Sequence, residues 1–150
     1  MTQPTPYRVL VTGSRDWANA ELVWAALNDV RDEALTAGRQ LVVVHGACPR
    51  GADADAAHWA EIGSQFATWI KAEAHPAEDH PTQDFGPWPG AGPRRNQYMV
   101  SLGADVTLAF IGPCTSPRCR RPRPHPSHGA SGCAALAKKA GIPVRPWTEP

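Results

Sequence analysis

The densest group of metal-ligating side chains lies in residues 114–133, which contain three of the four cysteines and two of the six histidines. Cys114 and Cys119 are separated by four residues, and His125 and His128 by two. Two thiolates and two imidazoles form a set that holds Zn2+ tetrahedrally. We therefore predict one structural Zn2+ here, with Cys133 as an alternative fourth ligand. The spacing differs from standard zinc-finger patterns, so a flexible loop with unligated thiols is the competing interpretation.

The same segment carries a basic run, formed by Arg118, Arg120, Arg121 and Arg123. Arginines of this kind contact nucleic-acid phosphates. The run has no interleaved aromatic residues for base stacking, and the net charge of +1 provides no broad positive field. A solvated loop is therefore expected rather than a nucleic-acid site. A clamp over a ligand phosphate and a zinc-stabilised nucleic-acid interaction module are the alternatives.

A second kind of chemistry is indicated near the N-terminus. Residues 9–11 form a short apolar run typical of a buried strand, residues 12–14 break it, and a helix with one apolar face follows from Trp17. Such a turn lets the backbone approach a ligand closely, and the N–H groups at a helix start favour an anion. Arg15 and Asp16 stand where they could hold a phosphate and a ribose hydroxyl.

The pattern repeats further along the chain. The apolar run 41–44 leads into the glycine-containing segment 45–53, and a helix over about 52–63 follows. In an open parallel sheet, turns of this type lie together at the carboxyl edge, where ligands bind. The repetition therefore strengthens the prediction of a ligand site.

Two arginines stand near the start of another predicted helix. Pro93 suits a first helical turn, which would also contain Arg95 and Asn96. Cations gain nothing from the dipole at this end of a helix, so an anionic ligand explains them better. A surface salt bridge is the competing explanation.

The remaining pattern gives the fold class. Short strands over 66–70, 106–111 and 142–144, together with a helix over 129–140, complete an alternating α/β order. This order predicts a three-layer α/β/α sandwich with a mostly parallel sheet of about five strands. We expect a single domain over residues 1–150, with a Cys/His/Arg-rich insertion at about 112–128. The irregular segment 71–92, which contains Trp88, is expected to be either a functional lid or a solvated excursion.

Composition limits the compartment and the class. The chain is 42% hydrophobic and 19% charged, which is ordinary for a globular protein. It has no apolar run long enough to span a membrane and no signal-peptide pattern, so we expect a cytoplasmic protein without a membrane partner. In that compartment cysteines are expected as free thiols or metal ligands rather than disulfides.

Four segments together resemble a known family. They are Val-Thr-Gly-Ser-Arg-Asp at 11–16, His-Gly-Ala with Arg-Gly-Ala-Asp between 45 and 53, Gly-Pro-Arg-Arg-Asn at 92–96, and Ala-Asp-Val-Thr-Leu-Ala-Phe at 104–110. The set resembles the YspA/YpsA-like family of the SLOG superfamily, which is common in bacteria and their phages. The resemblance implies a Rossmann-like fold, a nucleotide-like small-molecule ligand, and homodimers, which are frequent in the superfamily. It implies a pocket lined by Gly13, Ser14, Arg15, His45, Gly46, Gly51, Asp53, Arg95 and Asn96.

Related LOG-type phosphoribohydrolases cleave the N-glycosidic bond of nucleoside monophosphates. Residues 128–136 resemble their glycine-rich phosphate turn, which implies ligand contacts from Gly129, Ser131 and Gly132. Leu136 stands at the position that matches their catalytic glutamate, and leucine cannot move a proton. Binding or sensing of a nucleotide or nucleotide-derived ligand is therefore the main hypothesis. The alternative is N-glycosidic hydrolysis with Asp16 or Asp53 as the catalytic carboxylate. No organic cofactor is predicted.

Overall fold

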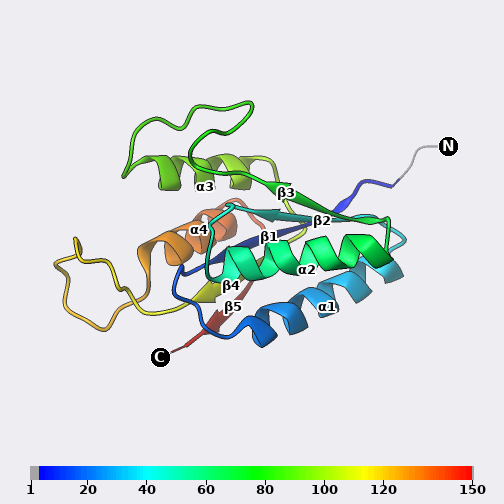
Figure 1. The fold of residues 1–150 in the computed structure, drawn as a ribbon, viewed down its shortest axis with the longest axis horizontal. Helices are drawn as coiled ribbons and strands as arrows, with labels where there is room; N and C mark the ends of the chain where they lie inside the picture. The colour runs from blue at the N-terminus through cyan, green and yellow to red at the C-terminus, as the bar shows by residue number, and fades with distance from the viewer. Residues whose placement is uncertain (1–3, 150) are drawn as a thin grey trace.

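The computed structural model of the chain describes residues 4–149 and contains one five-stranded sheet between two layers of helices (Figure 1). All pairings are parallel, and the strand order is β3-β2-β1-β4-β5. The predicted α/β class and parallel sheet are confirmed. The elements are β1 (Tyr7–Gly13), α1 (Ala20–Thr36), β2 (Leu41–His45), α2 (Ala52–Phe66), β3 (Ile70–Ala74), α3 (Ala91–Ser101), β4 (Val106–Ile111), α4 (His128–Lys139) and β5 (Val144–Thr148).

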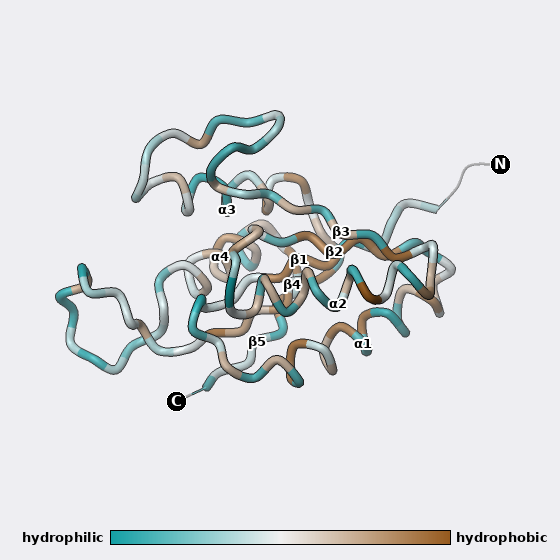
Figure 2. Tube along the Cα trace, in the orientation of Figure 1, coloured by the Kyte–Doolittle hydropathy of each residue, from teal (hydrophilic) through white to brown (hydrophobic). Residues whose placement is uncertain are grey.

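Two apolar clusters explain why the helices form two layers. The larger cluster joins α1 and α2 to one face of the sheet, with Leu27, Val30 and Phe110 fully buried. The smaller cluster joins α3 and α4 to the other face through Met99, Ala137 and their neighbours. Figure 2 shows the hydrophobic colour concentrated along the central strands between the layers. The central strands consist largely of apolar residues because both of their faces are covered.

The two edge strands lie elsewhere than predicted. The third strand was expected over 66–70, but α2 continues to Phe66, which is 86% exposed, and β3 begins at Ile70. The last strand was expected over 142–144, but β5 covers Val144–Thr148. Both edge strands contain charged residues, and β5 contains Pro146, which an edge strand tolerates. A search for apolar runs therefore missed them.

The first helix also begins later than expected. Trp17 lies before α1, buried with its ring centroid 5.5 Å from that of Phe110. The side chain of Asn19 caps α1 by accepting a hydrogen bond from the Leu22 N–H. No helix within residues 4–149 is long and apolar enough to cross a membrane.

Candidate functional site

The carboxyl ends of β1 and β4 define the position of the candidate site. These strands are neighbours, and the chain leaves β1 towards α1 and β4 towards α4 on opposite faces of the sheet. A crevice forms outside the sheet at such a point and is the usual ligand site of this architecture. The first two predicted turns lie on one side of it.

Glycines allow these two turns to pack against each other. A Cβ at Gly13 would overlap the Cβ of Ala52, the first residue of α2. Gly51 has φ +75°, and a Cβ there would overlap the carbonyl oxygen of Ser14. Gly13 and Gly51 lie outside the lining of the cleft described below, and their contacts are between the two turns.

A cleft of about 500 Å3 opens at this edge. The starts of α3 and α4 line it, and Arg50 lines it just before α2 begins; the Ser127 side chain makes no capping hydrogen bond to α4, and the other two helices have a glycine at the cap position. Unpaired N–H groups and the dipole at a helix start favour an anion. The lining residues are Ser14, Arg15, Asp16, Arg50, Trp88, Pro89, Gly92, Pro93, Arg95, Asn96, Pro113, Cys114, Thr115, Ser116, Pro117, Ser127, His128 and Gly129.

A second hollow of about 230 Å3 shares three of these walls. Arg15, Trp88 and Arg95 line both spaces, and the smaller one also contacts Glu78 and the turn after β2. The Arg15 guanidinium lies over the Trp88 ring, 5.5 Å from its centroid. Within residues 4–149 it makes no hydrogen bond or ion pair, so its charge remains available to a ligand.

Asp16 lines the larger cleft with its carboxylate already engaged. It accepts a hydrogen bond from the Thr115 hydroxyl at 2.6 Å, and its other oxygen lies 3.4 Å from Nη2 of the Arg50 guanidinium. These contacts connect the first turn to the segment after β4 and to the turn after β2. The carboxylate is half exposed and can also accept a hydrogen bond from a ligand hydroxyl.

Asp53 lies beneath the cleft rather than in its lining. Its Oδ2 accepts a hydrogen bond from the Gly46 N–H at 3.2 Å. Burial raises the pKa of Asp53 to about 6, opposed by the nearby Arg95 guanidinium. Asp53 therefore holds the turn after β2, and its buried carboxylate lies outside the lining of both hollows.

Arg95 is the most constrained cation of the site. It donates to the carbonyls of Gly46 at 2.5 Å and His75 at 3.1 Å, and its Nε donates to Asn96 at 2.8 Å. A Cβ at Gly46 would lie 2.6 Å from Arg95 Nη1. The glycine therefore allows the guanidinium to lie against the backbone. Arg95 and Asn96 both line the cleft, from the second turn of α3 rather than the expected first turn, because the helix begins at Ala91.

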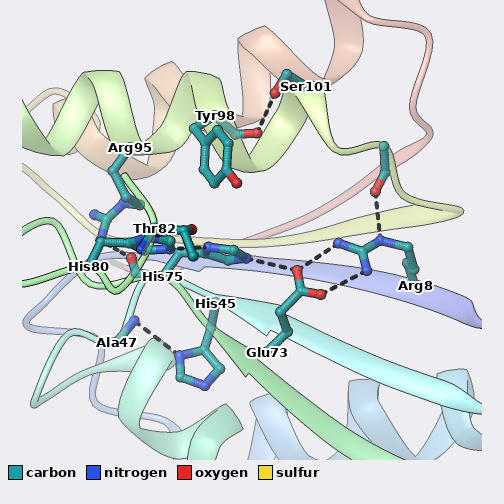
Figure 3. Close-up of polar contacts among 11 residues, drawn as sticks. Arg8, His45, Ala47, Glu73, His75, His80, Thr82, Arg95, Tyr98 and Ser101 are labelled. Carbon is teal, nitrogen blue, oxygen red and sulfur yellow. Dashed lines mark hydrogen bonds and ion pairs between the residues drawn. The ribbon is translucent and has the colours of Figure 1, made fainter. Parts of the chain in front are cut away.

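His45 has a structural environment. It is 4% exposed, and its Nδ1 accepts a hydrogen bond from the Ala47 N–H at 3.0 Å (Figure 3). Burial above all, and also the nearby Arg95 guanidinium, lowers its pKa to about 4. The imidazole is neutral at pH 7 and lies outside the lining of both hollows.

The start of α4 contributes the third side of the cleft. Gly129 lines it, whereas the Ser131 hydroxyl donates back to the Ser127 carbonyl at 2.7 Å. Gly132 is exposed and outside the lining, and a Cβ there would meet no atom within 4 Å. The Ser14 hydroxyl bonds the Ser127 hydroxyl and accepts from the Gly112 N–H at 2.8 Å. Ser14 thus ties the ends of β1 and β4 to α4.

The segment 75–90 between β3 and α3 is anchored by a chain of polar groups that the sequence did not reveal (Figure 3). His80 Nδ1 accepts from the Thr82 N–H at 3.2 Å, which leaves His80 Nε2–H to donate to His75 Nδ1 at 2.8 Å. His75 Nε2–H then donates to Glu73 at 2.7 Å. This assignment satisfies every group with both imidazoles neutral.

Arg8 completes this anchor from β1. It forms a paired contact with both oxygens of Glu73, at 3.0 and 2.7 Å, and holds the pKa of Glu73 at about 2. The sequence signal for this network was limited to His75, which directly follows β3, and His80 in the segment after it. Phe85 and Tyr98 pack on the histidine rings from the segment itself and from α3.

The predicted metal ligands come together in the segment between β4 and α4, which forms another wall of the cleft. Ligand atoms of Cys114, Cys119, His125 and His128 all lie within 4.8 Å of one another. Cys119 Sγ is 3.4 Å from His125 Nε2 and 3.2 Å from His128 Nε2, and the two nitrogens are 3.3 Å apart. A zinc tetrahedron with bonds of about 2.0–2.3 Å has edges of about 3.3–3.8 Å. The four residues could therefore hold a metal ion.

The surrounding backbone supports this geometry. The His125 Nδ1 lies 2.8 Å from the Pro122 carbonyl, a contact that orients Nε2 towards a metal. A bridge between Pro113 and Pro126 and a hydrogen bond from the Cys114 N–H to the His125 carbonyl close the base of the segment. Cys133 lies outside the cluster, buried near Thr12, where burial raises its thiol pKa to about 11. It does not replace Cys114 or Cys119.

Comparison with known proteins places the chain in a family. The sequence profile of the YspA, cpYpsA-related SLOG family matches residues 7–75, which contain the first two turns. The Gene 61 protein of Mycobacterium phage D29 is 42% identical over 139 residues, covering 91% of this chain and 93% of that protein. No solved structure matches. The chain belongs to the YspA, cpYpsA-related SLOG family.

Proposed function

We propose that the chain binds a nucleotide or nucleotide-derived small molecule in the cleft at the carboxyl edge of the sheet. The observation that carries the proposal is the meeting of Arg15, Arg50 and Arg95 with the starts of α3 and α4 in one cleft of about 500 Å3. Arginines and unpaired helix N–H groups share one preferred ligand, a phosphate. Membership of the SLOG family is consistent with a nucleotide-related ligand.

Each wall has a defined role in this proposal. Arg15 and Arg95 neutralise the phosphate, and the N–H groups at the start of α4, around Gly129, donate hydrogen bonds to it. Asp16 accepts a hydrogen bond from a ribose hydroxyl while retaining its contact with Thr115. Asp53 and His45 act from beneath by fixing the turn that Arg95 contacts.

Binding is favoured over N-glycosidic hydrolysis by the position of Leu136. This side chain packs against the α3–α4 apolar cluster and lines a separate groove with Val100 and Ile142. Leucine carries no carboxylate, and the Asp53 carboxylate lies outside the lining of the cleft. Asp16 is the one cleft-lining residue proposed for hydrolysis, and it lacks a neighbouring buried acid within residues 4–149 to form a pair.

Thermal unfolding with AMP, GMP, CMP and UMP tests the binding proposal. A ligand at 100 times its Kd stabilises by about 2.7 kcal/mol, equivalent to a rise in Tm of about 5–10 °C for a protein of this size. Arg15→Ala should weaken binding about tenfold or more because a charge-assisted hydrogen bond is lost. Arg31→Ala, which removes an exposed arginine of α1, is the matched control. Equal affinities for the wild type and Arg15→Ala would contradict the assignment, and free base in the recovered mixture would indicate hydrolysis.

We also propose that the metal is one structural Zn2+, since two thiolates and two imidazoles saturate a tetrahedral site and leave no open position. Elemental analysis should find about one zinc per chain. Cys119→Ser should lose it, whereas Cys48→Ser, outside the cluster, should retain it. A strong chelator should lower the Tm, because metal binding supplies part of the folding free energy of the segment. A metal-free protein with an unchanged Tm would contradict this proposal.

A further inference from the structure

We infer that Trp88 is the residue that selects ligands with a planar base: its indole face is a stacking platform, covered by Arg15 until a ligand takes that place. This inference rests on the proposed function, because it concerns the same cleft. It adds a chemical requirement, an aromatic ring next to the phosphate, that the arginines and helix starts do not impose.

The exposure of Trp88 is the first observation. Four large apolar side chains within residues 4–149 are exposed: Leu35, Phe66, Trp88 and Leu102. Leu35, Phe66 and Leu102 stand at the carboxyl ends of helices, at the opposite edge of the sheet. Trp88 alone lies at the candidate site, 46% exposed, and lines both hollows of the cleft. An exposed indole costs solvation free energy that a stacked base would recover.

The position of the indole is fixed from several sides. Its N–H donates to Glu78, and its ring lies over Gly92 in the first turn of α3, where a Cβ would come within 3.3 Å. Arg94 donates to the carbonyls of Phe85 and Pro87 and so holds the chain just before Trp88. The ring is therefore presented to the cleft by an organised segment, which keeps the entropic cost of stacking low.

The face of the indole towards the cleft is occupied by a side chain that can leave. Arg15 is exposed, and its guanidinium lies 5.5 Å from the ring centroid. A cation–π contact at an exposed site is weak, whereas a guanidinium–phosphate contact is charge-assisted and can be bidentate. A ligand that carries a phosphate and a planar base therefore replaces the contact between Arg15 and Trp88 by two new contacts. Arg15 moves to the phosphate, and the base stacks on the Trp88 ring.

The test compares a ligand that has a base with one that lacks it. Affinities of AMP and ribose 5-phosphate are measured calorimetrically for the wild type, Trp88→Phe and Trp88→Leu, after thermal unfolding confirms that each variant is folded. Loss of base–aromatic stacking weakens binding about 5- to 150-fold. Trp88→Leu should therefore lose AMP affinity by this factor with less than about a twofold change for ribose 5-phosphate. Trp88→Phe should retain most of the AMP affinity.

The outcomes separate this inference from the proposed function. If the wild type binds both compounds and Trp88→Leu binds AMP equally well, the stacking role is wrong while the phosphate site stands. If Trp88→Leu loses both compounds equally, Trp88 acts only by shaping the segment 75–90, and the inference is again wrong. If the wild type binds neither compound, the proposed function fails and this inference fails with it.

Discussion

Replacing His45 by asparagine should change how the stability of the protein depends on pH. The imidazole is buried, accepts a hydrogen bond from the Ala47 N–H, and has its pKa lowered to about 4. An asparagine carbonyl can accept the same hydrogen bond but does not titrate. The two proteins therefore differ in proton binding more than in hydrogen bonding at this turn.

The size of the effect follows from linkage. The ordinary pKa of histidine, 6.5, is that of the unfolded chain, and the folded value is lower. The unfolded state thus binds a proton first as the pH falls, so the stability contribution of His45 is complete above about pH 6.5 and is lost towards pH 4. One pKa unit corresponds to about 1.4 kcal/mol, which gives a loss of about 2 kcal/mol at pH 5 and about 3 kcal/mol at pH 4.

The stability contribution of Asp53 changes with pH in the opposite direction to that of His45. The pH dependence of the wild-type unfolding free energy therefore does not by itself report on His45. Burial raises the pKa of Asp53 from 3.8 to about 6, so the folded state binds a proton first and gains stability as the pH falls between these values. This gain offsets much of the loss from His45. The difference between the wild type and His45→Asn cancels the contribution of Asp53 and isolates the histidine.

Urea unfolding of both proteins at pH 7.5, 6 and 5 provides the measurement. His45→Asn should be less stable at pH 7.5 because it loses packing, and the gap should narrow by about 2 kcal/mol at pH 5. His58→Asn, at an exposed position of α2, controls for loss of a histidine as such. A gap that stays constant between pH 7.5 and 5 would refute the assignment of His45 as a buried neutral residue.

Three further substitutions test the packing of the site. Gly46→Ala should cost about 1–3 kcal/mol in urea unfolding, because its Cβ would lie 2.6 Å from Arg95 Nη1, and it should also weaken AMP binding measured by calorimetry. Gly132→Ala, whose Cβ would meet no atom within 4 Å in α4, should instead raise the stability by about 0.5–1 kcal/mol; a loss would contradict the observed geometry. Glu73→Gln should lower the stability at pH 7 by about 1 kcal/mol, since the Arg8 pair is partly exposed, and should flatten the acid branch of the stability curve. The sign follows from the Glu73 pKa of about 2: its contribution is present above pH 4.5 and is lost as the pH falls, so an unchanged acid branch would count against the pairing.

The central strands were predictable because they are buried on both faces and consist of apolar runs. The edge strands β3 and β5 were not, because Lys71, Glu73 and Arg145 are compatible with an edge but resemble a loop in sequence. Helix starts were predicted where a proline or a glycine stood near them. At α1 the aromatic Trp17 was assigned to the helix because a buried side chain before a helix has the same apolar character as one within it.

The candidate site shows the same division between local and long-range information. The Cys/His cluster that could hold a metal ion, and the arginines at the cleft, were predictable because residue types at short spacing carry the chemistry. The anchor of the segment 75–90 was missed because Arg8 and Glu73 are distant in sequence and meet only through the pairing of β1, β2 and β3. His45 and Asp53 were predicted as ligand-binding residues, but both are buried outside the cleft lining, a position that depends on how two turns pack and that spacing does not determine.

Different interactions hold each wall of the cleft in place, and these interactions affect the entropy that a ligand would lose on binding. The turn after β1 is fixed by glycine packing, and the segment 75–90 by a neutral histidine chain. The third wall, from Cys114 to His128, is poor in apolar contacts and is the place where a metal would act. Cys114 and His128 belong both to the metal cluster and to the cleft lining. A metal that orders this wall would therefore reduce the entropy that a ligand must lose on binding, and by linkage the ligand would tighten the metal site in return.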